Sequence, residues 1–148
     1  MRSHSPCEIL VCNECESVYH DHRWYLKEQA LEAVRSHREA IGHTLCPACQ
    51  KTRDKMPGGV VRLMGGFVSA HKEEILNLIR NEGDRAKQIN PLERVMEIEA
   101  TNGSLDILTT NERLAQRIGK AMHKAYSGDV SYVFSRDTKL ARVTWHRD

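Results

Sequence analysis

The sequence predicts an α+β fold in which a four-cysteine zinc-ribbon module with an inserted helix precedes a ferredoxin-like antiparallel sheet with two helices. Two observations lead to this fold class. The chain carries two C-x-x-C pairs, Cys12 to Cys15 and Cys46 to Cys49, separated by 30 residues. From Val60 onward, apolar periodicity and turn residues give the order β-α-β-β-α-β-β, whose first six elements match a split βαβ arrangement.

The two cysteine pairs predict a metal site. A C-x-x-C turn places two sulfurs on one side of a tight loop, which is half of a tetrahedral site. Together Cys12, Cys15, Cys46 and Cys49 offer four thiolates, a set that suits structural Zn²⁺. The gap between the pairs exceeds the roughly 15–20 residues of a minimal ribbon, so it should hold an inserted element. Two unrelated thiol pairs, or a redox dithiol beside a spare pair, are the alternatives.

The inserted element is predicted to be a helix. Residues 17–22 are polar and turn-like, whereas residues 24–41 show helical spacing through Leu26, Ala30 and Val34. Four cysteines already satisfy zinc, so we expect the histidines near them to be solvated. Cys7 is expected to be an incidental N-terminal cysteine, with a spare ligand or an exchangeable thiol as the alternatives. The alternative ligands in this region are His20, His22, His37 and His43.

A stretch rich in basic residues and glycine, residues 51–59, separates the predicted domains at 1–57 and 58–148. In the second domain, Asn102-Gly103 favours a hairpin turn, and Thr109-x-x-Glu112 resembles a helix capping box. The predicted strands are residues 60–64, 94–101, 105–109, 130–135 and 140–146, and the predicted helices are residues 69–89 and 109–126.

The sequence gives little support for catalysis. It contains no P-loop, no G-x-S-x-G, no H-E-x-x-H and no G-x-G-x-x-G motif. A zinc site with four cysteine ligands also leaves no open position for a substrate. We therefore expect a protein that is not an enzyme and has no small-molecule substrate.

Charge is distributed unevenly along the chain. Net charge is only +2, but residues 107–148 contain 8 basic and 4 acidic residues. Four of the cations recur on one side of the predicted helix 109–126, where they could follow the phosphates of RNA, and three more lie on the hairpin after it. A solvated helix face is the alternative. The candidate RNA-binding residues are Arg113, Arg117, Lys120, Lys124, Arg136, Lys139 and Arg142.

Two aromatic residues, Tyr132 and Phe134, alternate along one strand of the last hairpin, and Trp145 lies on its partner strand. Such residues on an open sheet can stack on bases, but packing in the core is the favoured interpretation. The N-terminus has no signal-peptide pattern, and no apolar run approaches the ~20 residues of a membrane span. Together with an odd number of cysteines, this predicts a cytoplasmic protein without a membrane partner.

The chain resembles small bacterial zinc-ribbon proteins related to the Nmd export adaptor of the archaeal and eukaryotic large ribosomal subunit. The resemblance runs through nearly the whole chain. Its quoted pieces are the two cysteine pairs, Arg23-Trp24-Tyr25, Gly59 to Gly66, His71-x-x-Glu74-Ile75, Leu78 to Glu82, Pro91 to Val95, Thr109-Thr110, Leu114-Ala115-x-x-Ile118-Gly119-x-Ala121 and Arg142-Val143-x-Trp145.

This resemblance implies zinc binding and contact with the large ribosomal subunit, and the family name is also tied to messenger-RNA decay. Because the chain is far shorter than the export adaptor, nuclear export does not carry over. The expectation is a non-catalytic zinc protein that associates with RNA or the ribosome and affects ribosome stability or messenger-RNA decay. A zinc-stapled protein-interaction adaptor and a thiol- or zinc-responsive regulator are the alternatives.

Overall fold

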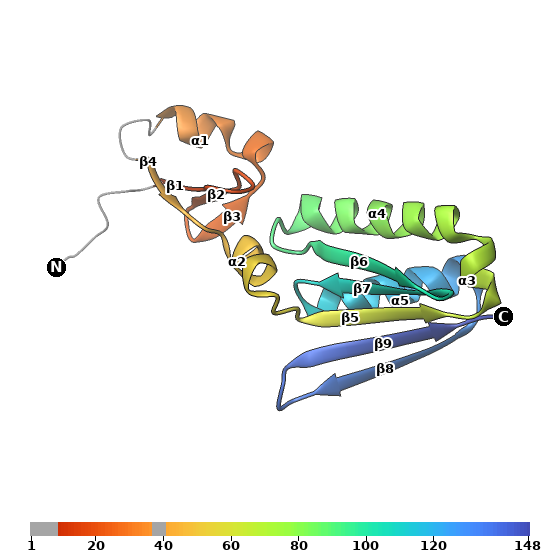
Figure 1. Ribbon diagram of the computed structural model, residues 1–148. Coiled ribbons are helices and arrows are strands. Elements are labelled where there is room, and N and C mark those ends of the chain that lie inside the picture. The colour runs from red at the N-terminus through yellow and green to blue at the C-terminus, as the bar shows by residue number, and fades with distance from the viewer. Residues whose placement is uncertain (1–8, 37–40) are drawn as a thin grey trace.

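A computed structural model describes residues 9–36 and 41–148 of the chain, so Cys7 and His37 lie outside the described residues. Two β-sheets of different size lie at either end of a connecting helix, α2 (Pro47–Asp54) (Figure 1). This combination of sheets and helices, with the cysteines near the N-terminus, confirms the predicted α+β class. In the parts of the chain that the structure covers, no helix has the length and apolar character needed to cross a membrane.

The smaller sheet has the strand order β3-β2-β1-β4, in which β1 and β4 are parallel and the other pairs antiparallel. Ile9, Val18 and Ala30 form its buried core. Its elements are β1 (Ile9–Cys12), β2 (Val18–His20), β3 (Arg23–Tyr25), the 3-10 helix η1 (Lys27–Gln29), α1 (Leu31–Ser36) and β4 (Ile41–Thr44).

The helix predicted for residues 24–41 is much shorter than expected. Trp24 and Tyr25 instead pair with β2, which agrees with the preference of aromatic side chains for strands. Ile41 opens β4 and pairs with Ile9 of β1. Among the described residues of this segment, 24–36 and 41, only α1 has an α-helical conformation, because strand pairing at both ends of the segment overrides its local helical periodicity.

The larger sheet has the strand order β6-β7-β5-β9-β8. The predicted element order is confirmed, with one difference: the first helix is broken at His71 into two pieces. The elements are β5 (Gly59–Met64), α3 (Gly66–Ala70), α4 (Lys72–Ile89), β6 (Val95–Thr101), β7 (Ser104–Thr109), α5 (Glu112–Tyr126), β8 (Asp129–Ser135) and β9 (Leu140–His146).

The sheet departs from the predicted antiparallel, ferredoxin-like pattern at one pair of strands. β9 lies between β5 and β8 and runs parallel to β5, whereas the other three pairs are antiparallel. The reason is the apolar side chains of β9, since Ala141, Val143 and Trp145 are all buried. In a six-element ferredoxin-like fold, β8 would pair directly with β5. Here β8, most of whose residues are exposed, lies at the edge of the sheet, and β9 separates it from β5.

The helices bury their apolar faces against the same side of this sheet. Ile75 and Ile79 of α4 join Leu114, Ile118 and Met122 of α5 in one core cluster with residues of β5, β7 and β9. A β-carbon at Gly119 would lie 2.6 Å from the Cγ1 atom of Val143, so this glycine lets α5 approach β9 closely.

The predicted capping box is wrong in its cap residue. Asn111, rather than Thr109, begins α5: its side chain accepts a hydrogen bond of 3.0 Å from the backbone N–H of Leu114. The Thr109 hydroxyl instead donates to backbone oxygens of Gly59 and Asn111. The sequence pattern points to the correct helix start but not to the side chain that caps it.

Replacing Asn111 with alanine should lower the free energy of unfolding by about 1 kcal/mol, because the first turn of α5 loses its side-chain acceptor. Chemical denaturation would measure this change. Asn77→Ala, at an exposed position in α4, is the matched control and should stay within about 0.5 kcal/mol of wild type. Equal stabilities of the two variants would contradict the cap assignment.

Candidate functional site

The four predicted metal-ligating cysteines come together at the junction of the two sheets. Their Sγ atoms all lie within 4.8 Å of one another, and all four cysteines are free. Cys12 and Cys46 are buried, while Cys15 and Cys49 are partly exposed. In the described residues this is the one group of histidine, cysteine and acidic side chains placed to hold a metal, so the alternative ligands His20, His22 and His43 receive no support.

Parallel pairing of β1 with β4 brings the distant cysteine pairs together. Cys12 ends β1 opposite Thr44, and the backbone N–H of Asn13 donates to the Thr44 carbonyl at 2.8 Å. Cys46 lies two positions after Thr44 in the sequence. Its backbone N–H donates to Cys12 Sγ at 3.3 Å. The pairing of β1 with β4 therefore brings the two ends of the 30-residue insertion close together.

The second cysteine pair is held by the start of α2, an element that the sequence analysis missed. Cys46 is the N-cap residue and Pro47 follows it, a combination typical of helix starts. The Cys46 sulfur accepts a hydrogen bond of 3.4 Å from the N–H of Cys49. Both sulfurs lie near a helix N-terminus, where negative charge is favoured.

The geometry fits a tetrahedral metal site. Metal–sulfur bonds of about 2.3 Å in a tetrahedron place neighbouring sulfurs about 3.8 Å apart. The Sγ atoms of Cys15 and Cys46 lie 3.7 Å apart. A set of four sulfurs suits Zn²⁺ or iron, so the donor chemistry matches a metal centre rather than a disulfide pair.

The groups around the four cysteines lower the pKa of one thiol and raise the pKa of another. Burial disfavours ionisation of Cys15, but its contacts with Ser17 and Arg94 outweigh this and lower its pKa to about 6. Burial, together with the Cys46 thiol, raises the pKa of Cys49 to about 12. Four adjacent thiolates repel one another, so a bound cation is what allows all of them to be ionised together.

Arg94, from the larger domain, reaches over the sulfur cluster. Its Nη1 donates to Cys49 Sγ at 3.3 Å, and its Nη2 donates to Cys15 Sγ at 3.0 Å and to Cys46 Sγ at 3.6 Å. Nη2 also donates to Ser17 Oγ at 3.1 Å. One guanidinium thus contacts three of the four candidate ligands and opposes the negative charge of a four-thiolate centre.

The loop that carries Arg94 is itself fixed by partly buried hydrogen bonds. The Arg94 Nε donates to the Pro91 carbonyl at 2.7 Å. The hydroxyl of Thr110, a buried residue, donates to the Leu92 carbonyl at 2.6 Å and accepts from the Arg94 N–H at 2.9 Å. Lys51 of α2 donates to the Thr110 carbonyl at 2.6 Å. These contacts fix α2 and the four-cysteine site to the larger domain.

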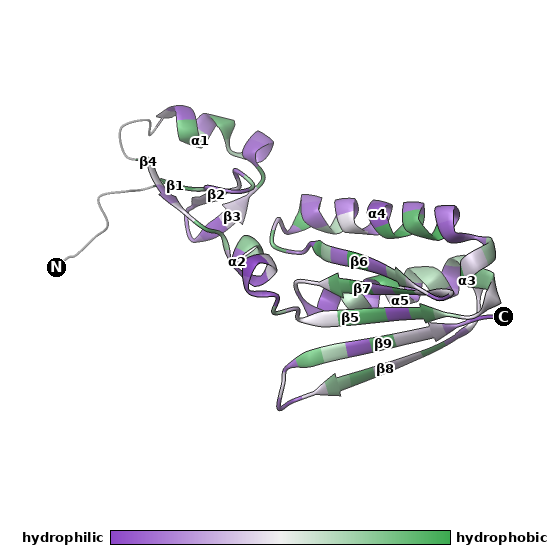
Figure 2. Cartoon of the chain, in the orientation of Figure 1, coloured by the Kyte–Doolittle hydropathy of each residue, from purple (hydrophilic) through white to green (hydrophobic). Residues whose placement is uncertain are grey.

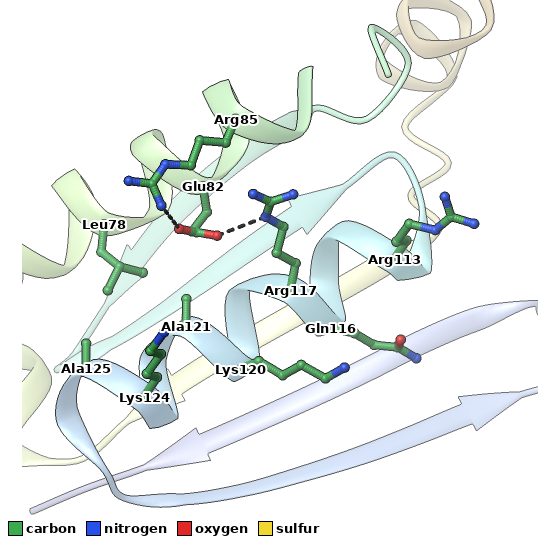
Figure 3. Close-up of a pocket in the computed structure, with 10 residues that line it drawn as sticks. All are labelled: Leu78, Glu82, Arg85, Arg113, Gln116, Arg117, Lys120, Ala121, Lys124 and Ala125. Carbon is green, nitrogen blue, oxygen red and sulfur yellow. Dashed lines mark hydrogen bonds and ion pairs between the residues drawn. The ribbon is translucent and has the colours of Figure 1, made fainter. Parts of the chain in front are cut away.

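A second feature is a groove of about 770 Å³ between α4 and α5. Figure 3 shows side chains from both helices around it. Four of the candidate RNA-binding residues line this groove, and Arg85 adds a fifth cation that the sequence analysis did not single out. Glu82 is the one acidic residue in its lining. The four predicted residues in the groove are Arg113, Arg117, Lys120 and Lys124.

Glu82 connects the two walls of the groove. Its carboxylate accepts a hydrogen bond of 2.9 Å from Arg117 Nε and lies 3.3 Å from Arg85 Nη1 (Figure 3). Arg117 is therefore partly buried and paired rather than a simple surface cation. Lys120 and Lys124 are exposed, and neither forms an ion pair with another residue in the described part of the chain.

The three candidate residues of the last hairpin lie away from the groove. Arg136 and Lys139 are in the β8–β9 turn. Arg142 alternates with the buried Ala141 and Val143 on β9, so it faces the side of the sheet opposite α5. A single continuous surface therefore does not include all seven predicted residues, and the groove gathers four of them.

The aromatic residues of the same hairpin differ from the favoured interpretation. Trp145 is fully buried, as expected, and its Nε1 donates to the Ser127 carbonyl at 2.7 Å. Tyr132 and Phe134 are exposed. Both face the helix side of the sheet, because they pair with Val143 and Ala141, so they do not form an open platform for bases.

No protein-family model matches the chain, and no curated protein matches it at a significant level. The resemblance to the Nmd-related zinc-ribbon proteins therefore stays a prediction that rests on the residues quoted above.

Proposed function

We propose that this protein is a non-catalytic zinc-binding protein that binds RNA through the groove between α4 and α5. The observation that carries the RNA part is the lining of that groove, which contains five cationic side chains and one carboxylate. Lysine and arginine at this density neutralise phosphates and release their counterions, which provides affinity without reading sequence. The groove has no aromatic side chain in its lining, so the ligand chemistry we assign to it is the phosphate backbone.

Zinc is the metal we assign to the cysteine site. Four thiols within 4.8 Å of one another favour it, and such closed sites are typical of structural zinc. A zinc ion held by four cysteines has no free position for a substrate, which supports a structural rather than a catalytic role. The four free thiols also support a reducing compartment such as the cytoplasm.

The resemblance to ribosome-associated zinc-ribbon proteins supports the ribosome as the source of this RNA, with an effect on ribosome stability or messenger-RNA decay. The metal module and the groove are physically connected, since Arg113 of the groove lies 3.8 Å from the buried carboxylate of Glu93. Glu93 is adjacent in sequence to Arg94, which contacts the sulfurs. Zinc binding would thus stabilise the end of α5 at which the groove begins.

Charge reversal of Lys120 and Lys124 to glutamate should weaken binding to a mixed-sequence single-stranded RNA, measured by fluorescence anisotropy. Both side chains are exposed, so the variant should stay folded. Loss of two phosphate contacts should also flatten the dependence of log K on log salt by roughly 1.4. Arg117 is unsuitable for this test, because a glutamate there would face Glu82.

The control is reversal of Glu73 and Glu74 to lysine, two exposed residues at the start of α4 that do not line the groove. This variant should bind RNA at least as well as wild type. Co-sedimentation with ribosomes, before and after nuclease treatment, separates an RNA partner from a protein partner. A folded Lys120/Lys124 variant that binds RNA like wild type would reject the groove as the RNA site.

A further inference from the structure

The two edges of the larger sheet differ in how they are protected from pairing. β6 carries a register shift between Val95 and Glu97 and two neighbouring carboxylates, Glu97 and Glu99. Bulges and charges are the usual means by which an edge strand avoids a second strand. β8 has no register shift, since its pairing with β9 is regular from Asp129 onward. Its one charge, Asp129, is at its first position, and residues 130–135 contain no charge and no proline.

β8 is also the most apolar exposed segment of the described chain. Tyr132, Val133 and Phe134 are 42%, 60% and 48% exposed, and they make up half of the large exposed hydrophobic residues. The strand is coloured hydrophobic toward its hairpin end in Figure 2. Tyr132 and Phe134 face the helix side and Val133 faces the other side, so the exposed apolar surface follows the strand edge rather than one face.

We propose that β8 pairs with β8 of a second copy of this chain, in antiparallel orientation, to make one continuous sheet across a dimer. Identical strands that pair antiparallel are related by a two-fold axis perpendicular to the sheet, so residues on the same face meet. An axis at Tyr132 places Val130 opposite Phe134 of the second copy. It places Ser131 opposite Val133, on the face without helices.

The sequence of β8 is complementary to itself in this arrangement. Valine opposite phenylalanine is a favourable cross-strand pair, and it occurs twice across the axis. Asp129 begins the strand and Arg136 follows its end, so antiparallel pairing brings opposite charges of the two copies near each other at both ends. Parallel pairing would instead bring Asp129 next to Asp129. These features favour a second copy over an unrelated peptide as the occupant of the edge.

The dimer does not depend on the proposed RNA function, but it has a geometric consequence for it. A two-fold axis perpendicular to the sheet keeps the helices of both copies on the same side. Both α4–α5 grooves would therefore open on one side of the dimer.

The test is analytical ultracentrifugation of the zinc-loaded full chain over a wide concentration range. Wild type should show a concentration-dependent monomer–dimer equilibrium. In the double variant Ser131→Lys/Val133→Lys, the lysine at position 131 of each copy would lie directly opposite the lysine at position 133 of the other copy. Dimerisation should therefore weaken by about tenfold or more. Both positions are exposed, so the monomer should keep its fold and its metal content.

The double variant Ser131→Glu/Val133→Glu should be monomeric for the same reason. A mixture of the lysine and glutamate variants should form a heterodimer, because each lysine then faces a glutamate. Ile89→Lys, at a position 69% exposed on α4, is the matched control and should dimerise like wild type. A wild type that stays monomeric, a lysine variant that still dimerises, or a mixture that stays monomeric would each overturn the proposal.

Discussion

Replacing Cys46 with serine should abolish stoichiometric zinc binding and unfold the N-terminal module. The Cys46 sulfur lies 3.7 Å from Cys15 Sγ and caps α2, and the residue is fully buried. Zinc binding to such four-ligand sites amounts to roughly 10–16 kcal/mol of apparent free energy, and it is coupled to folding. The small core of Ile9, Val18 and Ala30 offers little to replace that contribution.

Elemental analysis and limited proteolysis would measure the outcome. Wild type should contain one zinc per chain, and the variant should be cleaved rapidly within residues 9–54. Cys7→Ser is the control and should retain full metal content, because four other cysteines supply the ligands. A Cys46→Ser protein with one zinc and a protease-resistant N-terminal module would disprove the four-cysteine assignment.

Replacing Arg94 with methionine should lower the affinity for zinc by about 10- to 100-fold, the usual effect of removing a group that hydrogen-bonds to metal ligands. Methionine is unbranched and flexible, so it can fill the space left by the arginine stem, but it has no N–H groups for the sulfurs of Cys15, Cys46 and Cys49. Competition with a chromophoric chelator would give the affinity. Proteolysis should also become faster between the two domains, because the module loses its main polar attachment.

Arg53→Met is the matched control for this change. Arg53 lies on α2, near the same site, but it is exposed, and its ion pair is with the exposed Glu14, at 3.5 Å. Its replacement should leave zinc affinity within a factor of about two, since exposed ion pairs contribute little. If Arg94→Met binds zinc as tightly as Arg53→Met, the Arg94 guanidinium does not contribute to zinc affinity.

Much of the larger domain was predictable because its signals are local. Alternating apolar residues, the Asn102-Gly103 turn and the helical stripes place its strands and helices within a few residues of where they lie. The position of β9 was not predictable in this way. Both strands of the last hairpin contain alternating apolar residues, and only the packing of Trp145 and Val143 against the helices decides which strand takes the inner place.

The cysteine ligands were predictable because spacing alone identifies a C-x-x-C half-site. The contribution of Arg94 was not, because it lies 45 residues or more from every cysteine and carries no local signal. The same limit applies to the groove. Helical spacing gives the cations of α5, but the pairing of Arg117 with Glu82 depends on how α4 packs beside α5.

The inner position of β9 has a consequence for how the chain folds. The register pairs Gly59 of β5 with Ala141 of β9, so the centre of the larger sheet joins segments 82 positions apart in the sequence. Contacts between such distant segments form slowly, because the chain loses much conformational entropy before they form. During synthesis, the apolar faces of α4 and α5 must wait for β9 to leave the ribosome.

The N-terminal module has no such delay, since all of its strands, α2 and the four cysteines are complete by Asp54. It can bind its metal and fold while the rest of the chain is still being made. Folding should therefore occur in two steps along the chain. The metal-stabilised N-terminal module forms first, and the larger sheet forms later, when β9 pairs with β5. Arg94, on the loop between α4 and β6, joins the finished first module to the second as the larger sheet forms.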